Sequence, residues 1–232
     1  MTRSANVVRP WRGQSPEERV AERKARLLDA ALDVFTECGY QATTVRDICR
    51  AAGLTERYFY ESFPNREALL IALGDVIVAD IVTAAAPSLD VVATDLDAGI
   101  VGAIEAVVRS LTDDPRRARI VFVESVGVSP EVERQRRAAI ARIATVIAEA
   151  AALRFGEWAR ESVEVEMIAR TVIGGASELV VAYIRGELPI NQRELVTNTT
   201  LILLRARTVL VAMAAERDIP PDLLPVSETQ ED

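Results

Sequence analysis

The strongest constraint on the fold comes from helical apolar patterns that glycines interrupt between residues 17 and 63. In the first pattern, apolar side chains recur three and four positions apart, at Leu27, Ala30, Ala31, Val34 and Phe35. This spacing predicts an amphipathic helix over residues 17–38 that buries one face. Gly39 is a natural stop for that helix.

A shorter helix is predicted next. Thr43 or Thr44 can cap it, because a threonine hydroxyl accepts a hydrogen bond from a free amide of the first turn. Its inner face would consist of Val45, Ile48, Cys49 and Ala52. Gly53 then breaks the helix.

A third helix is predicted after Gly53, with Thr55 as its cap and Phe59 and Phe63 turned inward. Pro64 ends it, and Asn65 can cap a fourth helix. Two short helices across a glycine turn, buttressed by a longer one, predict a helix-turn-helix.

The rest of the chain also has helical patterns and no alternation typical of strands. Helices are expected at 65–85, 92–111, 115–126, 130–155, 161–186 and 192–216, and Pro or Gly lies at each break. We divide the chain into a flexible basic arm, the helix-turn-helix domain, a larger helical domain and an acidic Pro-rich tail, at 1–16, 17–66, 67–216 and 217–232.

The charge is unevenly distributed along a chain whose formal net charge is −8. Residues 1–66 carry 11 Lys and Arg against 9 Asp and Glu, whereas residues 67–232 carry 16 against 26. A polyanionic partner therefore suits the front of the chain and not the back.

Several classes of protein are not expected. There is no apolar run of the roughly 18 residues that span a membrane, and no secretory signal. The chain has no histidine, and it lacks the nucleophile elbow, the P-loop and the dinucleotide fingerprint, so neither an enzyme nor a cofactor is expected. Asp113 and Asp114 suit a turn and a helix cap better than a catalytic pair. Cys38 and Cys49 fit a reducing cytoplasm, with a redox pair as the less favoured alternative.

The segment Leu27–Leu70 resembles the N-terminal domain of TetR-family transcriptional regulators. The resemblance lies in the order and spacing of "F…CGY", "TTVRDI", "AGLT", the aromatic third helix and "FPNREALL". It implies an all-α protein, with an N-terminal three-helix helix-turn-helix DNA-binding domain followed by a larger helical ligand-binding and dimerisation domain. It also implies a homodimer on a palindromic double-stranded operator, which most often acts as a repressor.

The outward residues of the predicted motif supply donors for DNA. Arg57, near the start of the third helix, and Arg46, where relatives often read a base, could each make the two-pronged contact with guanine. Thr44, Tyr60 and Arg66 suit phosphate. The complete set of candidate DNA contacts is Thr44, Arg46, Thr55, Glu56, Arg57, Tyr58, Tyr60, Ser62 and Arg66.

Two features of this set stay open. Relatives often carry a small or basic residue where Glu56 and Tyr58 stand, so Glu56 could accept from cytosine N4, repel unwanted sequences or merely neutralise Arg57. In the arm, Arg9, Trp11 and Arg12 could enter the minor groove or make no contact.

The last two long helices are apolar on more than one face, which suggests a dimer interface of four helices. Its candidate residues are Ile173, Gly174, Ser177, Val180, Leu203 and Val209. Burial within one chain is the alternative.

By resemblance, helices between about 65 and 160 would bind an effector. An apolar lining with a few polar groups suits a hydrophobic small molecule. The candidates are Phe122, Glu124, Ser125, Ile143, Ile147 and Trp158, although the same composition suits a helical core. An activator, a regulator without effector and a helical interaction protein that does not bind DNA remain alternatives.

Overall fold

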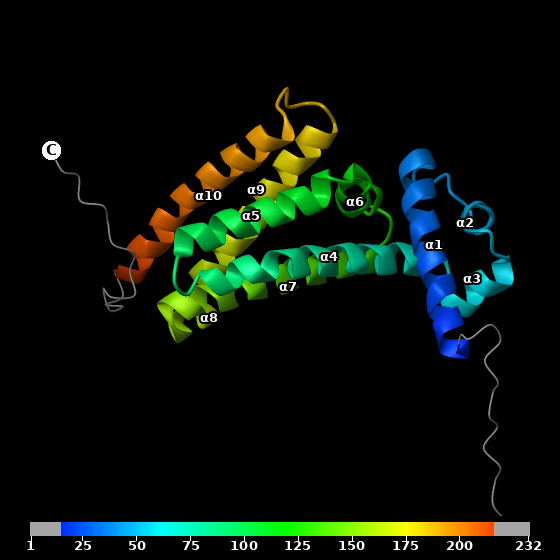
Figure 1. Ribbon diagram of the computed structural model, residues 1–232, viewed down its shortest axis with the longest axis horizontal. Helices are drawn as coiled ribbons and strands as arrows, with labels where there is room; N and C mark the ends of the chain where they lie inside the picture. Colours follow the sequence, from blue (N-terminus) through cyan, green and yellow to red (C-terminus); the bar gives the residue numbers. More distant parts are fainter. Residues whose placement is uncertain (1–14, 216–232) are drawn as a thin grey trace, which may run out of the picture. The chain divides into compact units, whose positions relative to one another are not determined.

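The computed structural model describes residues 15–215, with side chains except at positions 154, 203 and 206–215 (Figure 1). Every regular element in this range is helical. The elements are α1 (Pro16–Cys38), α2 (Val45–Ala52), α3 (Glu56–Ser62), α4 (Arg66–Val91), α5 (Leu96–Thr112), α6 (Pro115–Arg119), the π-helical turn η1 (Ile120–Glu124), α7 (Pro130–Phe155), α8 (Glu157–Glu161), α9 (Val163–Ile184) and α10 (Gln192–Ala215). The predicted all-α class is confirmed.

The chain divides at Leu73–Gly74 into two compact units, and α4 runs through this division. In the first unit, α1 packs against α2 and α3. Its core consists of the side chains that the apolar periods indicated, including Leu27, Phe35, Ile48, Cys49 and Phe59, each at most 4% exposed. The periodicity therefore identified the buried face of each of these helices.

The start of α1 differs from the prediction. Ser15 and Pro16, expected in the arm, are the cap and the first residue of α1. The Ser15 hydroxyl accepts from the Glu18 amide at 3.1 Å, and the Glu18 carboxylate accepts from the Ser15 amide at 2.6 Å. The sequence "SPEE" contains this reciprocal capping signal, so the earlier start could have been predicted. The minor-groove candidates Arg9, Trp11 and Arg12, and the predicted tail, lie outside the described residues.

In the second unit, α5 packs against α9 and α10, while α7 packs against α8 and α9 (Figure 1). One apolar cluster ties the end of α7 to α8 and the start of α9 through Phe155, Ala159 and Val165, which are at most 2% exposed. Val108 and Leu111 of α5 are also buried. This unit has the layered helical packing of a bundle.

The break predicted after Ala86–Pro87 is wrong, because α4 continues through Pro87 to Val91. This end of α4 lies close to α5. A Cβ placed on Gly99 of α5 would lie 2.6 Å from the Val92 side chain and 2.9 Å from the Ser88 carbonyl oxygen. The absence of a side chain at Gly99 therefore lets α5 approach the end of α4 closely.

Two other predicted helices are each divided. The segment 115–126 is a short α-helix followed by the π-helical turn η1, and the segment 161–186 contains the end of α8 and all of α9. Ser162 separates α8 from α9, and its hydroxyl accepts a hydrogen bond from the Val165 amide. A serine cap inside an apolar pattern marks this second start.

Two helices, α4 and α9, are long and apolar enough to cross a membrane by length and composition alone. In α4 the two acidic residues of the apolar stretch are paired within the second unit. Asp75 accepts from Arg142 of α7 at 2.9 Å, and Asp80 accepts from Arg117 of α6 at 2.9 Å. These two ion pairs tie α4 to α7 and α6.

Candidate nucleic-acid interface

The start of α2 is fixed by a reciprocal cap. The Thr44 hydroxyl accepts from the Asp47 amide, and the Asp47 carboxylate accepts from the Thr44 amide at 3.0 Å. The Thr44 hydroxyl also donates to the Asp47 carboxylate at 2.5 Å, and this bond, with the one from the Thr44 amide, holds the pKa of Asp47 below its ordinary value. Of the two caps that the sequence left open, Thr44 is the one used, whereas Thr43 is 1% exposed and donates to the Gly39 carbonyl at 2.8 Å.

The turn between α2 and α3 depends on Gly53, whose φ of +61° lies in the left-handed region that favours glycine. From α1, the Arg26 guanidinium donates to the Ala52 carbonyl at 2.6 Å and to the Gly53 carbonyl at 3.3 Å. The last carbonyls of a helix otherwise lack partners. Arg26 therefore fixes the end of α2, a role that the sequence pattern did not reveal.

In α3 one aromatic side chain, Phe59, is fully buried, whereas Tyr58 is 37% and Tyr60 is 56% exposed. Phe63, which directly follows the helix, is also buried, at 4% exposed. Thr55 caps the helix without a side-chain hydrogen bond to it. A short helix held by one buried ring presents its remaining faces to a partner, as a recognition helix must.

The two arginines expected to read bases are exposed and weakly paired. The Arg46 side chain is 85% exposed and lies 3.7 Å from Glu56. The Arg57 side chain is 84% exposed and donates to Glu61 at 3.0 Å. The suggested neutralisation of Arg57 by Glu56 is therefore wrong, because Glu61, one helical turn on, pairs with Arg57. Exposed pairs contribute only about 0–1 kcal/mol, so either guanidinium can exchange its carboxylate for DNA.

Two other candidates have partly structural roles. The Arg23 guanidinium of α1 lies 4.6 Å from the centre of the Tyr58 ring, so Tyr58 helps to join α3 to α1. Ser62 is half-buried in the last turn of α3. Tyr58 is nevertheless 37% exposed, whereas Ser62 contributes less free surface than the exposed face predicted for it.

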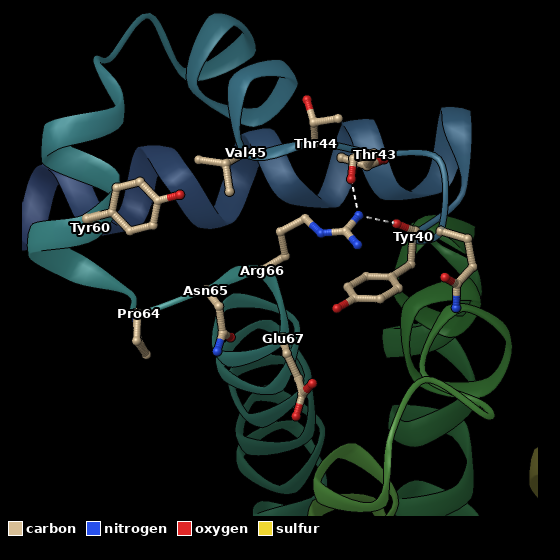
Figure 2. Close-up of a pocket in the computed structure, with 10 residues that line it drawn as sticks. Tyr40, Thr43, Thr44, Val45, Tyr60, Pro64, Asn65, Arg66 and Glu67 are labelled. Carbon is tan, nitrogen blue, oxygen red and sulfur yellow. Dashed lines mark hydrogen bonds between the residues drawn. The ribbon is translucent and has the colours of Figure 1, made fainter.

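A groove of about 620 Å³ lies beside these helices in the first unit (Figure 2). Its walls come from the α1–α2 turn, the start of α2, α3 and the start of α4. All three predicted phosphate donors, Thr44, Tyr60 and Arg66, line it. Figure 2 shows the Arg66 side chain directed at the main chain of the α1–α2 turn. Its Nη1 donates to the carbonyls of Tyr40 and Thr43.

The comparisons with known proteins agree with this geometry. A family model described as "Bacterial regulatory proteins, tetR family" matches residues 27–73. Residues 27–73, which lie in the first unit, are therefore similar to this family.

Curated relatives are similar over limited lengths. The transcriptional repressor KstR2 of Rhodococcus jostii is 44% identical over 48 residues, which cover 21% of this chain and 24% of that protein. The transcriptional activator FasR of Mycolicibacterium smegmatis is 28% identical over 114 residues, which cover 49% of this chain and 52% of that protein. The chain thus spans about a quarter to a half of these relatives. They are named as regulators, not as enzymes.

Solved structures show the same fold over most of the chain. The fatty acid degradation regulator FadR of Bacillus halodurans superimposes with a TM-score of 0.69 at 20% identity, covering 82% of this chain and 96% of that one. FadR of Bacillus subtilis, solved in complex with stearoyl-CoA, gives a TM-score of 0.65 at 17% identity. The match covers 77% of this chain and 96% of that one. At these identities the likeness establishes a shared architecture.

The predicted interface residues on α9 differ in exposure. Gly174 is exposed, Ile173 and Ser177 are half-buried, and Ser177 donates to the Ile173 carbonyl at 2.6 Å. Val180 is 2% exposed within the single chain, so almost none of its side chain is available to a partner. The predicted residues Leu203 and Val209 lie among the side chains that the structure does not describe.

Several predicted pocket residues already have partners. Glu124 accepts from Arg119 at 2.9 Å, and Ser125 donates to the Val121 carbonyl at 2.6 Å. Trp158 packs against the apolar cluster around Phe155. The remaining predicted residues, Phe122, Ile143 and Ile147, are half-buried.

Proposed function

We propose that the protein is a transcriptional regulator that binds double-stranded DNA through the exposed faces of α2 and α3. The observation that carries this proposal is the contrast within α3, where Phe59 is fully buried while Arg57 and Tyr60 are exposed beside Arg46 of α2. A stiffly held short helix with exposed guanidinium and phenol groups can enter a major groove.

In this proposal Arg46 and Arg57 contact base edges, and Thr44, Thr55 and Tyr60 contact phosphates. The Thr55 hydroxyl makes no capping hydrogen bond, so it is available to a phosphate oxygen. The phenol of Tyr60 stands on a ring that contacts Phe59 edge-on, with ring centres 5.4 Å apart. Such contacts fix the register of the protein on DNA.

We further propose that two chains pair through α9 and α10. The first turns of α9 expose Val163 at 65% and Met167 at 62%, and α10 exposes Leu201 at 52% and Ile202 at 59%. A Cβ placed on Gly174 or on its neighbour would meet nothing within 4 Å, so another helix can approach there. A two-fold dimer would present its recognition helices about 34–36 Å apart to a palindromic operator.

We also propose that a hydrophobic small molecule binds the second unit and shifts the population away from the DNA-binding arrangement. FadR of Bacillus subtilis, which shares this fold, was solved with stearoyl-CoA, and this supports an acyl-chain compound as the first class to test. KstR2 is named a repressor and FasR an activator. We propose repression in the cytoplasm, with activation as the second candidate.

Selection of bound duplexes from a random pool tests the proposal. The full chain should enrich one palindromic motif whose half-sites lie about one helical turn apart. Arg57→Ala should lose the preference at one base position in each half-site. Enrichment of no motif by the wild-type chain would overturn the proposal.

A further inference from the structure

Arg66 lies in the first turn of α4, yet its side chain serves the turn before α2. Its Nη1 donates to the Tyr40 carbonyl at 2.8 Å and also to the Thr43 carbonyl, and its guanidinium carbon lies 4.7 Å from the centre of the Tyr40 ring. Figure 2 shows this reach, with both hydrogen bonds drawn. One side chain thus makes three contacts with a turn more than 20 residues away in sequence.

The turn that receives Arg66 is itself well fixed. The Tyr40 ring is 6% exposed and packs against Phe35, with ring centres 5.2 Å apart. Thr43 is 1% exposed and donates to the Gly39 carbonyl. Thr44 follows directly as the cap of α2. A displacement of Arg66 would therefore move the start of α2, where Thr44 and Arg46 face outward.

These contacts use the shape of arginine as well as its charge. A planar guanidinium can donate to two carbonyls while it lies over a ring, whereas a lysine ammonium is a point charge on a flexible stem. Arg26 acts in the same way at the other end of α2, through the carbonyls of Ala52 and Gly53. The helix α2 is thus held at both ends by arginines that donate to main-chain oxygens.

We infer that Arg66 is a positioning residue for DNA binding, which sets the place of the α2 N-terminus, rather than a phosphate contact as its sequence position suggested. This inference rests on the proposed DNA binding. Because α4 continues from Arg66 across the division at Leu73–Gly74, a movement of this helix must carry the α1–α2 turn with it or break the Arg66 contacts.

The test measures binding of the full chain to the selected duplex, with variants that distinguish the positioning role of Arg66 from a contribution of its charge. Arg66→Lys keeps the charge, Arg66→Gln removes it, and Tyr40→Leu removes the ring under the guanidinium together with its contact with Phe35. We expect all three to bind DNA at least tenfold more weakly while the slope of log affinity against log salt stays at its wild-type value. Arg109→Lys, an exposed exchange on α5 in the second unit, is the matched control and should bind within twofold of wild type.

Hydrogen exchange of the amides of residues 40–47 gives a second measurement that does not depend on DNA. Exchange should be faster in Arg66→Lys and unchanged in Arg109→Lys, with the helical circular dichroism of both preserved. This readout remains valid for a variant that folds but binds weakly.

Two results would overturn the inference. One is wild-type affinity in Arg66→Lys together with a salt slope reduced by about 0.9 per subunit in Arg66→Gln, which is the signature of a direct phosphate contact. The other is unchanged exchange over residues 40–47 in both Arg66 variants. A wild-type chain that binds no duplex would instead remove the proposed function, and the exchange result would still report whether Arg66 holds the turn.

Discussion

Gly53→Ala should destabilise the first unit by two separable effects. At a φ of +61°, an alanine costs about 1–2 kcal/mol because its Cβ crowds the backbone in the left-handed region. The added Cβ would also lie 3.1 Å from Arg26 Nη2. That nitrogen donates to the Ala52 carbonyl, and a hydrogen bond from a charged group contributes about 1.5–3 kcal/mol, of which part would be lost as Arg26 moves. The expected total is about 2–4 kcal/mol.

Native-state hydrogen exchange on the intact chain measures the loss of stability in the first unit separately from the second unit. The free energy of opening for amides in α2 and α3 should fall by the expected total in Gly53→Ala. Gly127→Ala is the matched control, because its φ is +71° and its added Cβ would meet nothing within 4 Å, so only the backbone cost of about 1–2 kcal/mol applies in the second unit.

A double-mutant cycle isolates the contribution of Arg26. In an Arg26→Ala background, Gly53→Ala should cost only the backbone part, so that the two substitutions are not additive. Unchanged protection of α2 and α3 in Gly53→Ala, or full additivity with Arg26→Ala, would refute the reasoning.

Three further predictions concern the interface. Tyr60→Phe should weaken binding to all duplexes by a similar factor, measured by titration of matched and scrambled sequences, and a loss confined to one sequence would argue against a phosphate contact. Arg57→Ala should lose about 1–3 kcal/mol of discrimination at one base position, measured with single-base variants of the selected duplex, and equal losses at every position would exclude a base contact. Asp47→Asn should destabilise α2 at neutral pH, since the capping carboxylate has a pKa below its ordinary 3.8. That stabilisation is present above this value and is lost as the pH falls through the lowered pKa, so wild type and variant should converge in acid melts.

The sequence predicted the framework of the first unit because local chemistry determines it. The cap at Thr44, the break at Gly53 and the inward ring of Phe59 each follow from a residue type at a helical position. The partners of individual charged side chains were harder to predict from the sequence, because they depend on how the helices pack against one another. Arg46 pairs with Glu56 across two helices, and Arg66 serves a turn that its own helix does not contain.

In the second unit, local rules failed where packing decides. Proline normally ends a helix, yet α4 passes Pro87 and its last turn is packed against Gly99. In the π-helical turn, Arg119 donates to Glu124 five positions on, a spacing that α-helical periodicity does not predict. The periodicity of the sequence predicted neither the helix through Pro87 nor the π-helical turn.

The most direct test of DNA binding is a titration of the full chain against a labelled duplex at 50 and 200 mM salt. A regulator dimer that contacts six or more phosphates should lose about a thousandfold or more in affinity between these concentrations. An affinity that is absent at low salt, or that does not change with salt, would contradict a DNA-binding role for α2 and α3.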